Sequence, residues 1–160
     1  MIETKKKSKI YFATRNHNKF DEIDRIFKQK TFIQLIHLHV SLIEIQSPDL
    51  EEIAVFSLRD IQDSIAQNLF FVEDSGLFIK QLNGFPGPYS AYVLKTLGLN
   101  GILTLMHKVE DREAYFQSSI AVKIENRMKL FSARVRGEIS KYISETGWGY
   151  DPIFIPEANG

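Results

Sequence analysis

The sequence contains no cysteine. This absence excludes disulfide bonds, thiolate metal sites and cysteine nucleophiles, and it fits a reducing compartment. No stretch approaches the roughly 18 consecutive apolar residues that a membrane-spanning helix needs. The first nine residues, which include Lys5, Lys6 and Lys7, are basic but lack the apolar core of a secretory signal. We therefore expect a cytoplasmic protein whose first residues form a solvated tail, with no membrane partner.

An excess of charge of one sign is also missing, because 20 basic residues balance 20 acidic ones. Nothing in this balance favours a nucleic-acid partner, so any anion-binding site must be local. The 160 residues are 44% apolar and 25% charged, which is typical of one globular domain with a substantial hydrophobic core. We expect residues 1–160 to form a single domain.

Hydrophobic periodicity alternates between short β-prone runs and helical segments, which predicts a mixed α/β fold with parallel and antiparallel strand pairs. The expected helices cover residues 19–29, 50–68, 89–96 and 100–108. The expected strands cover residues 9–14, 32–40, 69–73, 77–81, 114–125, 129–137 and 153–155, with one more short strand possible at 139–143. Asn126-Arg127 is the expected hairpin turn, and Asn16 or Asn18 the expected cap of the first helix.

The first candidate for chemistry is the turn of residues 13–19, where a predicted strand runs into a helix N-terminus. Backbone N–H groups and the positive helix end favour an anion there. Thr14 and Asn16 add neutral donors, and Lys19 adds a point charge. The turn is not a Walker loop. Strand–turn–helix segments are common, so a purely structural role fits the turn equally well.

The second candidate is acidic. An apolar run ends in Glu73 and Asp74, and Ser75 and Gly76 follow. If strand geometry persists, the two carboxylates point to opposite sides, so that one could hold a metal ion while the other activates water. A strand followed by a plain acidic turn is the alternative. A serine nucleophile is disfavoured because no histidine lies near Ser75 in the sequence.

Two further carboxylates, Glu51 and Glu52, open a predicted helix. They fit the helix dipole, and either could instead join a Mg²⁺ site.

The third candidate is the glycine-aromatic loop of residues 147–152. Trp148 and Tyr150 could stack on a planar ring while Asp151 reads its edge, although a packed aromatic loop is an equally good interpretation. The histidines give a weaker signal. His37 and His39 share one face of a predicted strand, without a third ligand apparent, and His17 lies in the turn before the first helix.

Three blocks, residues 13–19, 72–92 and 147–156, resemble in order and spacing the inosine/xanthosine triphosphate pyrophosphatases in their archaeal form, which are nucleotide house-cleaning enzymes. The resemblance implies Mg²⁺-dependent hydrolysis of ITP, dITP and XTP to the monophosphate and pyrophosphate. It also implies a homodimer. The implied fold is a long twisted mixed sheet with flanking helices that form two lobes around a central cleft.

The same resemblance assigns roles to individual residues. Triphosphate binding falls to Thr14, Asn16 and Lys19. Metal binding falls to Glu52, Glu73 and Asp74, with Glu51 as the alternative to Glu52, and Asp74 is also the general base. Substrate contacts fall to Ser75 and Gly76 at the floor of the site and to Trp148, Gly149, Tyr150 and Asp151 at the base and sugar.

The sequence departs from the family pattern at its end. Members of the family continue past the equivalent of residues 154–157 with a lysine, a Ser-His-Arg motif and a final helix, whereas this sequence ends at Gly160. We therefore expect the base-binding segment to be lacking. The alternative function is a nucleotide-binding module with reduced or no catalysis, and a pyrophosphatase for modified pyrimidine nucleotides is a third possibility.

Overall fold

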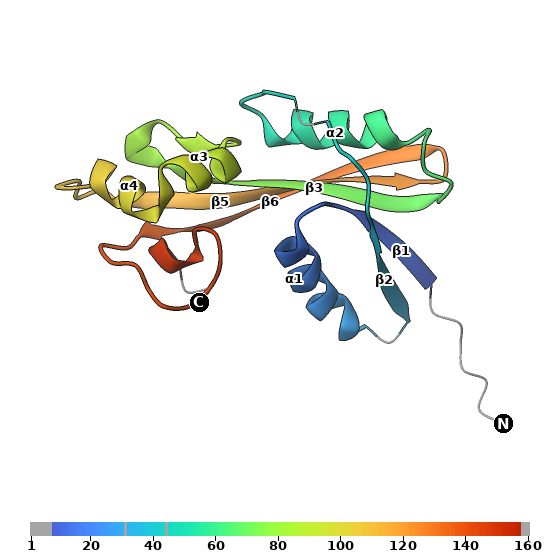
Figure 1. Ribbon diagram of the computed structural model, residues 1–160, viewed down its shortest axis with the longest axis horizontal. Coiled ribbons are helices and arrows are strands. Elements are labelled where there is room, and N and C mark those ends of the chain that lie inside the picture. The colour runs from blue at the N-terminus through green and yellow to red at the C-terminus, as the bar shows by residue number, and fades with distance from the viewer. Residues whose placement is uncertain (1–7, 31, 44, 158–160) are drawn as a thin grey trace. The chain divides into compact units, whose positions relative to one another are not determined.

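The computed structural model describes residues 8–157 except 31 and 44, so the basic N-terminal tail and residues 158–160 lie outside it. Its strands and helices follow one another as β1 (Ser8–Ala13), α1 (His17–Lys28), β2 (Ile33–Leu38), α2 (Leu50–Ile61), β3 (Leu69–Ile79), β4 (Pro86–Gly87), α3 (Ser90–Thr96), α4 (Gly98–Leu105), β5 (Glu113–Ile124), β6 (Arg127–Ile139) and β7 (Phe154–Pro156) (Figure 1). Two short 3-10 helices, η1 (Lys80–Leu82) and η2 (Asp151–Ile153), complete the list.

The strands form one sheet in the order β2-β1-β3-β5-β6-β7, and β4 pairs with β3. β1 is parallel to β2 and β3, whereas the β3–β4 and β6–β7 pairs are antiparallel. The predicted mixed α/β fold is thereby confirmed. Among the described residues, no helix is long and apolar enough to cross a membrane.

Chain contacts divide the protein into two compact units. The first unit contains residues 1–46, 51–73 and 120–131, and the second contains residues 47–50, 74–119 and 132–160. β3, β5 and β6 contribute residues to both units. Whether residues 1–160 behave as a single domain in solution stays a prediction.

In the first unit, α1 and α2 cover opposite faces of the central strands. Phe12 and Phe71 stack with ring centroids 4.5 Å apart and pack with the apolar residues of α1. Phe70 and Val72 instead belong to the cluster that includes Leu58 of α2. Because alternate residues of a strand face opposite sides, each residue of β3 can be assigned to the α1 face or the α2 face.

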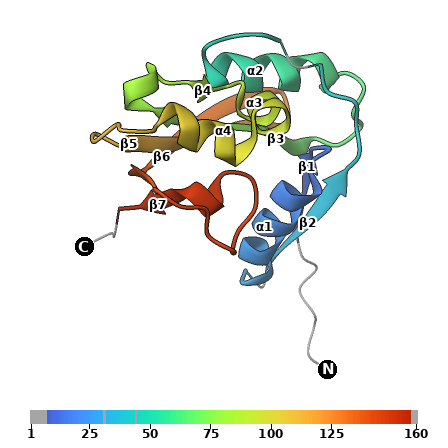
Figure 2. The same cartoon turned by 60° about the vertical axis from the view of Figure 1, so that its left-hand side comes forward.

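In the second unit, α3 and α4 lie side by side (Figure 2) and pack with the second half of β3. The guanidinium group of Arg112 ties this unit together, because it donates to the backbone carbonyls of Met106, Val109, Ile139 and Ser140. One side chain thus satisfies carbonyls from the end of α4 and from the end of β6, groups that would otherwise need other partners.

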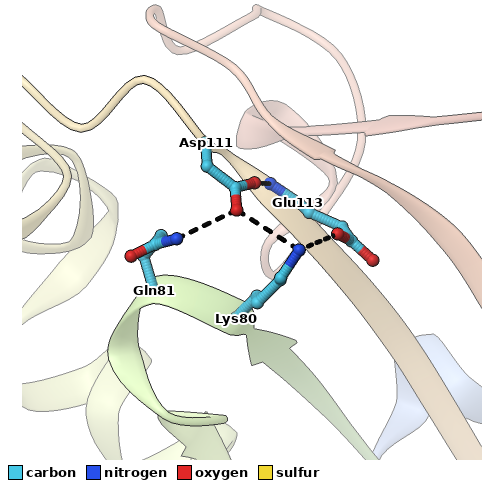
Figure 3. A network of polar contacts seen from close by, with 4 residues as sticks. All are labelled: Lys80, Gln81, Asp111 and Glu113. Atoms are coloured by element: carbon cyan, nitrogen blue, oxygen red, sulfur yellow. Dashed lines mark hydrogen bonds and ion pairs between the residues drawn. The ribbon is translucent and has the colours of Figure 1, made fainter.

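A polar network connects η1 with the start of β5 (Figure 3). Lys80 forms ion pairs with Asp111 and Glu113, and Gln81 donates to Asp111. Hydrogen bonds to Glu113 and Asp111 raise the pKa of Lys80, and the hydrogen bond from Gln81 is the main cause that lowers the pKa of Asp111. The network is exposed, so solvent screening limits its effect on stability.

Three predicted boundaries were wrong. α2 ends at Ile61 rather than 68, where Ser64 N donates back to Ile61 O and Lys123 Nζ donates to the Gln62 carbonyl. The hairpin turn is Glu125-Asn126, one residue earlier than predicted, because Glu125 takes a positive φ of 53° and its N–H bonds to Asn68 O. β6 continues to Ile139, and no strand covers residues 140–143.

Candidate functional site

The polar turn between β1 and α1 is organised by its own side chains. Thr14 is only 6% exposed, and its Oγ1 accepts a hydrogen bond from Asn16 N at 3.0 Å. Asn16 is the N-cap, as one of the two predicted alternatives, and its Oδ1 accepts from the N–H groups of Asn18 and Lys19 at 3.0 and 3.2 Å. A cap of this kind is worth about 1 kcal/mol. It also occupies two of the N–H groups that an anion could otherwise use.

Lys19, in the first turn of α1, forms an ion pair with β3. Its Nζ lies 2.8 Å from Oε2 of Glu73, and the two side chains are only 18% and 7% exposed. Glu73 follows Phe71 by two residues on β3 and therefore faces α1. The cationic turn and the acidic strand, predicted separately from the sequence, thus meet within the first unit.

The acidic segment is not a turn, so the break expected between the strands at 69–73 and 77–81 is wrong. β3 runs without interruption from Leu69 to Ile79 and includes Glu73, Asp74, Ser75 and Gly76. Strand geometry persists, so Asp74 faces the side of β3 opposite to Glu73, as the conditional prediction stated. The sequence favours a turn because Asp, Ser and Gly are rare in strands, but here long-range contacts override that preference.

Gly76 explains why the strand continues. A Cβ at this position would lie 2.3 Å from the carbonyl oxygen of Gly87, so only glycine allows β4 to approach. Ser90 completes the junction, because its Oγ accepts from Leu77 N at 2.9 Å and donates to Gly87 O at 2.6 Å. The segment that carries Asp74 is therefore held by its own neighbours in the second unit.

The remaining predicted carboxylates open α2. Glu51 is half-buried and Glu52 is exposed, both in the first turn. Among the described residues, no three His, Asp or Glu side chains form a ready-made metal site. This does not conflict with Mg²⁺, which commonly takes one or two carboxylates and completes its octahedron with water and substrate phosphates.

The two aromatic residues of the loop at 147–152 differ in exposure. Tyr150 is 4% exposed and belongs to the core of the second unit, where its hydroxyl donates to Ser90 O at 2.9 Å. Burial raises the pKa of Tyr150 to about 12. Trp148 is 37% exposed, and its backbone N–H donates to Asp151 Oδ2 at 3.2 Å. Trp148 is therefore the aromatic side chain of this loop that a ligand can reach.

The histidines were the feature that sequence reasoning missed. His37 and His39 were expected without a third partner, but His17 joins them, with ring centroids 5.4 and 5.9 Å from theirs. His17 is the first residue of α1, and the parallel pairing of β2 with β1 brings the three rings together. The spacing of the residues in the sequence could not show this.

Residues 10–160 match the Ham1 family. Over 94% of its length the chain is 45% identical to the dITP/XTP pyrophosphatase of Korarchaeum cryptofilum, of which it covers 80%. It is 44% identical, over 94% of its length, to the dITP/XTP pyrophosphatase of Pyrococcus horikoshii, of which it covers 81%.

A solved structure agrees with these sequence matches. The Ham1 protein of Staphylococcus aureus superposes with a TM-score of 0.74 at 29% identity, covering 92% of this chain and 80% of that one. The family resemblance drawn from the three sequence blocks is thereby confirmed. With a family match over nearly the whole length and relatives above 40% identity, the chain belongs to the Ham1 family.

Proposed function

We propose that the protein hydrolyses non-canonical purine nucleoside triphosphates, namely dITP, ITP and XTP, to the monophosphate and pyrophosphate. Its relatives from Korarchaeum cryptofilum and Pyrococcus horikoshii carry the name dITP/XTP pyrophosphatase. The observation in this chain that carries the proposal is the Lys19–Glu73 ion pair. It joins the turn suited to phosphates to the strand whose next residue is Asp74.

In this proposal the β1–α1 turn binds the triphosphate. Lys19 supplies the positive charge, and the Thr14 hydroxyl and the Asn16 amide group supply neutral donors. Since the N–H groups of Asn18 and Lys19 are already bonded to Asn16, the backbone contribution would come from the N–H groups of Arg15 and His17. A polyanion would compete with Glu73 for Lys19, so binding couples to the breaking or sharing of that ion pair.

Glu73 and Asp74 have different surroundings, which separates their proposed roles. Glu73 is nine-tenths buried beside Lys19. Asp74 is half-buried on the other face of the same strand and is the proposed general base. It would take a proton from the water that attacks the α-phosphorus, while the bond from that phosphorus to the bridging oxygen breaks and pyrophosphate leaves.

The proposed cofactor is Mg²⁺, held by Glu52, Glu73 and Asp74 or by a subset of them, with Glu51 as the alternative helix carboxylate. Carboxylate oxygens are the donors that Mg²⁺ prefers, so the residue types fit. When bound, the cation would neutralise the charge that moves to the leaving pyrophosphate. The remaining substrate contacts fall to Ser75, Gly76 and the loop of Trp148, Gly149, Tyr150 and Asp151.

The test is a substrate panel. The protein is incubated with dITP, ITP, XTP, dTTP, ATP and GTP, with Mg²⁺ or with EDTA, and pyrophosphate is measured. We expect release from the 6-oxo purines dITP, ITP and XTP far above release from ATP, and only with the cation. A folded sample that releases pyrophosphate from none of them contradicts the proposal. Calorimetric binding of dITP without turnover would then favour the nucleotide-binding module, and preference for dTTP would favour the pyrimidine alternative.

The proposal includes a homodimer in the cytoplasm. Support for association comes from β6, where Met128, Leu130 and Phe131 are 39%, 38% and 56% exposed. Sedimentation velocity would show a species of twice the chain mass if the homodimer forms, and a monomer at micromolar concentration would contradict it.

A further inference from the structure

We infer that His37 is a positioning residue for the phosphate-binding turn, an inference that rests on the function proposed above. His37 lies on β2 beside Phe12 of β1 in the parallel register. Its Nε2 reaches past the end of β1 to the carbonyl oxygen of Thr14, 2.9 Å away. A carbonyl oxygen can only accept a hydrogen bond, so Nε2 carries the proton and donates it.

The imidazole ring of His37 is fixed by its neighbours. Phe20 of α1 stacks on it with centroids 4.3 Å apart and planes 12° apart. The ring centroid of His39 lies 3.8 Å from that of His37, and the ring of His17 meets the His37 ring edge-on with centroids 5.4 Å apart. Packing of this kind restricts the rotamers of the ring, so the donor is held in place before any ligand arrives.

The hydrogen bond sets the direction of one peptide group. The peptide between Thr14 and Arg15 is trans, so its N–H points opposite to its carbonyl. With the Thr14 carbonyl held toward β2, the Arg15 N–H is presented to the other side. The peptide groups that follow are ordered from within the turn, by Thr14 Oγ1 and Asn16 Oδ1. His37 therefore fixes the orientation of the Thr14–Arg15 peptide group, which the side chains of the turn itself do not fix.

Two roles of His37 can be separated by substitution. His37→Phe keeps an aromatic ring for stacking on Phe20 but removes the donor. His37→Gln removes the ring but keeps an N–H donor at similar reach. If His37 serves only packing, the phenylalanine variant should keep more of the phosphate affinity. If His37 positions the turn, the glutamine variant should keep more of it. His39→Phe, on the same face of the same segment, is the matched control because its histidine does not donate to Thr14.

The experiment measures kcat and KM for dITP and, independently of catalysis, the calorimetric Kd for inorganic tripolyphosphate. Thermal unfolding is recorded for every variant. We expect His37→Phe to raise both KM and Kd about tenfold with kcat nearly unchanged, which is the effect of losing one preorganised hydrogen bond. For His37→Gln, KM and Kd should return most of the way to the wild-type values. For His39→Phe, KM and Kd should equal those of the wild type.

The inference is overturned if His37→Phe binds tripolyphosphate as the wild type does. It is also overturned if His37→Gln and His37→Phe weaken tripolyphosphate binding equally and in proportion to their losses in Tm. A wild-type protein that does not bind tripolyphosphate overturns it as well. A wild-type protein that binds tripolyphosphate but does not hydrolyse dITP refutes the proposed function alone, and the Kd comparison still decides the role of His37.

Discussion

Lys19 and Glu73 form an ion pair between the first turn of α1 and the middle of β3, with Nζ 2.8 Å from Oε2. Both side chains are largely buried, so the pair is screened little by solvent and neither charge is tolerated well without the other. Lys19 thus has two roles in the proposed enzyme. It compensates Glu73 in the free protein, and it offers a charge to the triphosphate.

The first prediction concerns Lys19→Ala. We expect the variant to weaken tripolyphosphate binding by more than tenfold and AMP binding much less, because only the longer polyanion needs the charge of Lys19 in this proposal. The free energy of unfolding should also fall by roughly 3 kcal/mol, since the buried carboxylate of Glu73 loses the positive charge of Lys19. Calorimetry and urea denaturation measure the two effects.

The double variant Lys19→Ala, Glu73→Gln separates these roles. It should recover much of the lost stability, because the buried negative charge of Glu73 is removed together with the charge of Lys19, while phosphate binding stays weak. Equal losses of tripolyphosphate and AMP affinity in Lys19→Ala would contradict the assignment of Lys19 to the outer phosphates.

The first unit shows how much of the site could be predicted. Periodicity located β1, α1 and β2, and residue chemistry singled out the turn of residues 13–19 and its capping asparagine. These features depend on neighbours in the sequence. The position of His37 depends on the register of two parallel strands, which no local pattern encodes. The contact between its ring and the Thr14 carbonyl could therefore be found only in the structure.

In the acidic segment of residues 73–76, by contrast, the local sequence preference predicts the wrong structure. Residues 73–76 have the composition of a turn, and the expected strands at 69–73 and 77–81 left room for one between them. In the fold, Lys19 compensates Glu73 and the missing side chain of Gly76 admits Gly87. Both contacts come from residues outside this segment, Lys19 far along the sequence and Gly87 on the next strand, so propensity alone favours the wrong local structure.

The second prediction concerns Asp74→Asn. Loss of a general base should lower kcat by a factor of about 10²–10⁴ while the protein stays folded and KM changes little. The control is Asp111→Asn, which removes a carboxylate from the exposed network of Figure 3 and should leave kcat unchanged. An Asp74→Asn variant that keeps most of its turnover removes Asp74 from the role of base.

The third prediction concerns Gly76→Ala. The new Cβ would lie 2.3 Å from Gly87 O, a backbone atom that cannot move away as a flexible side chain could. We expect β4 to shift from β3, with a loss of about 1–3 kcal/mol in the free energy of unfolding and a lower kcat, because Asp74 lies two residues away. Ser75→Ala is the control and should cost less stability. A free energy of unfolding equal to that of the wild type in Gly76→Ala would contradict the prediction, because it would show that β3 and β4 can separate to admit the Cβ without destabilising the protein.

The last prediction uses the pKa of Tyr150, which burial raises from 10.0 to about 12. In the unfolded chain this phenol loses its proton near pH 10, whereas in the folded protein it keeps the proton until about pH 12. The unfolded state therefore binds fewer protons in this interval, and the free energy of unfolding falls as pH rises. The contribution is fully present below pH 10 and is lost by about pH 12.

Urea denaturation at pH 8, 10 and 11 measures this dependence. Tyr150→Phe should be less stable at pH 8, because it loses the hydrogen bond to Ser90 O, and its stability should fall less between pH 10 and pH 11 than that of the wild type. Tyr142→Phe is the control, because Tyr142 is 79% exposed and its substitution should leave the wild-type slope unchanged. Parallel slopes for Tyr150→Phe and the wild type would show that the Tyr150 phenol is not protected from ionisation by the core of the second unit.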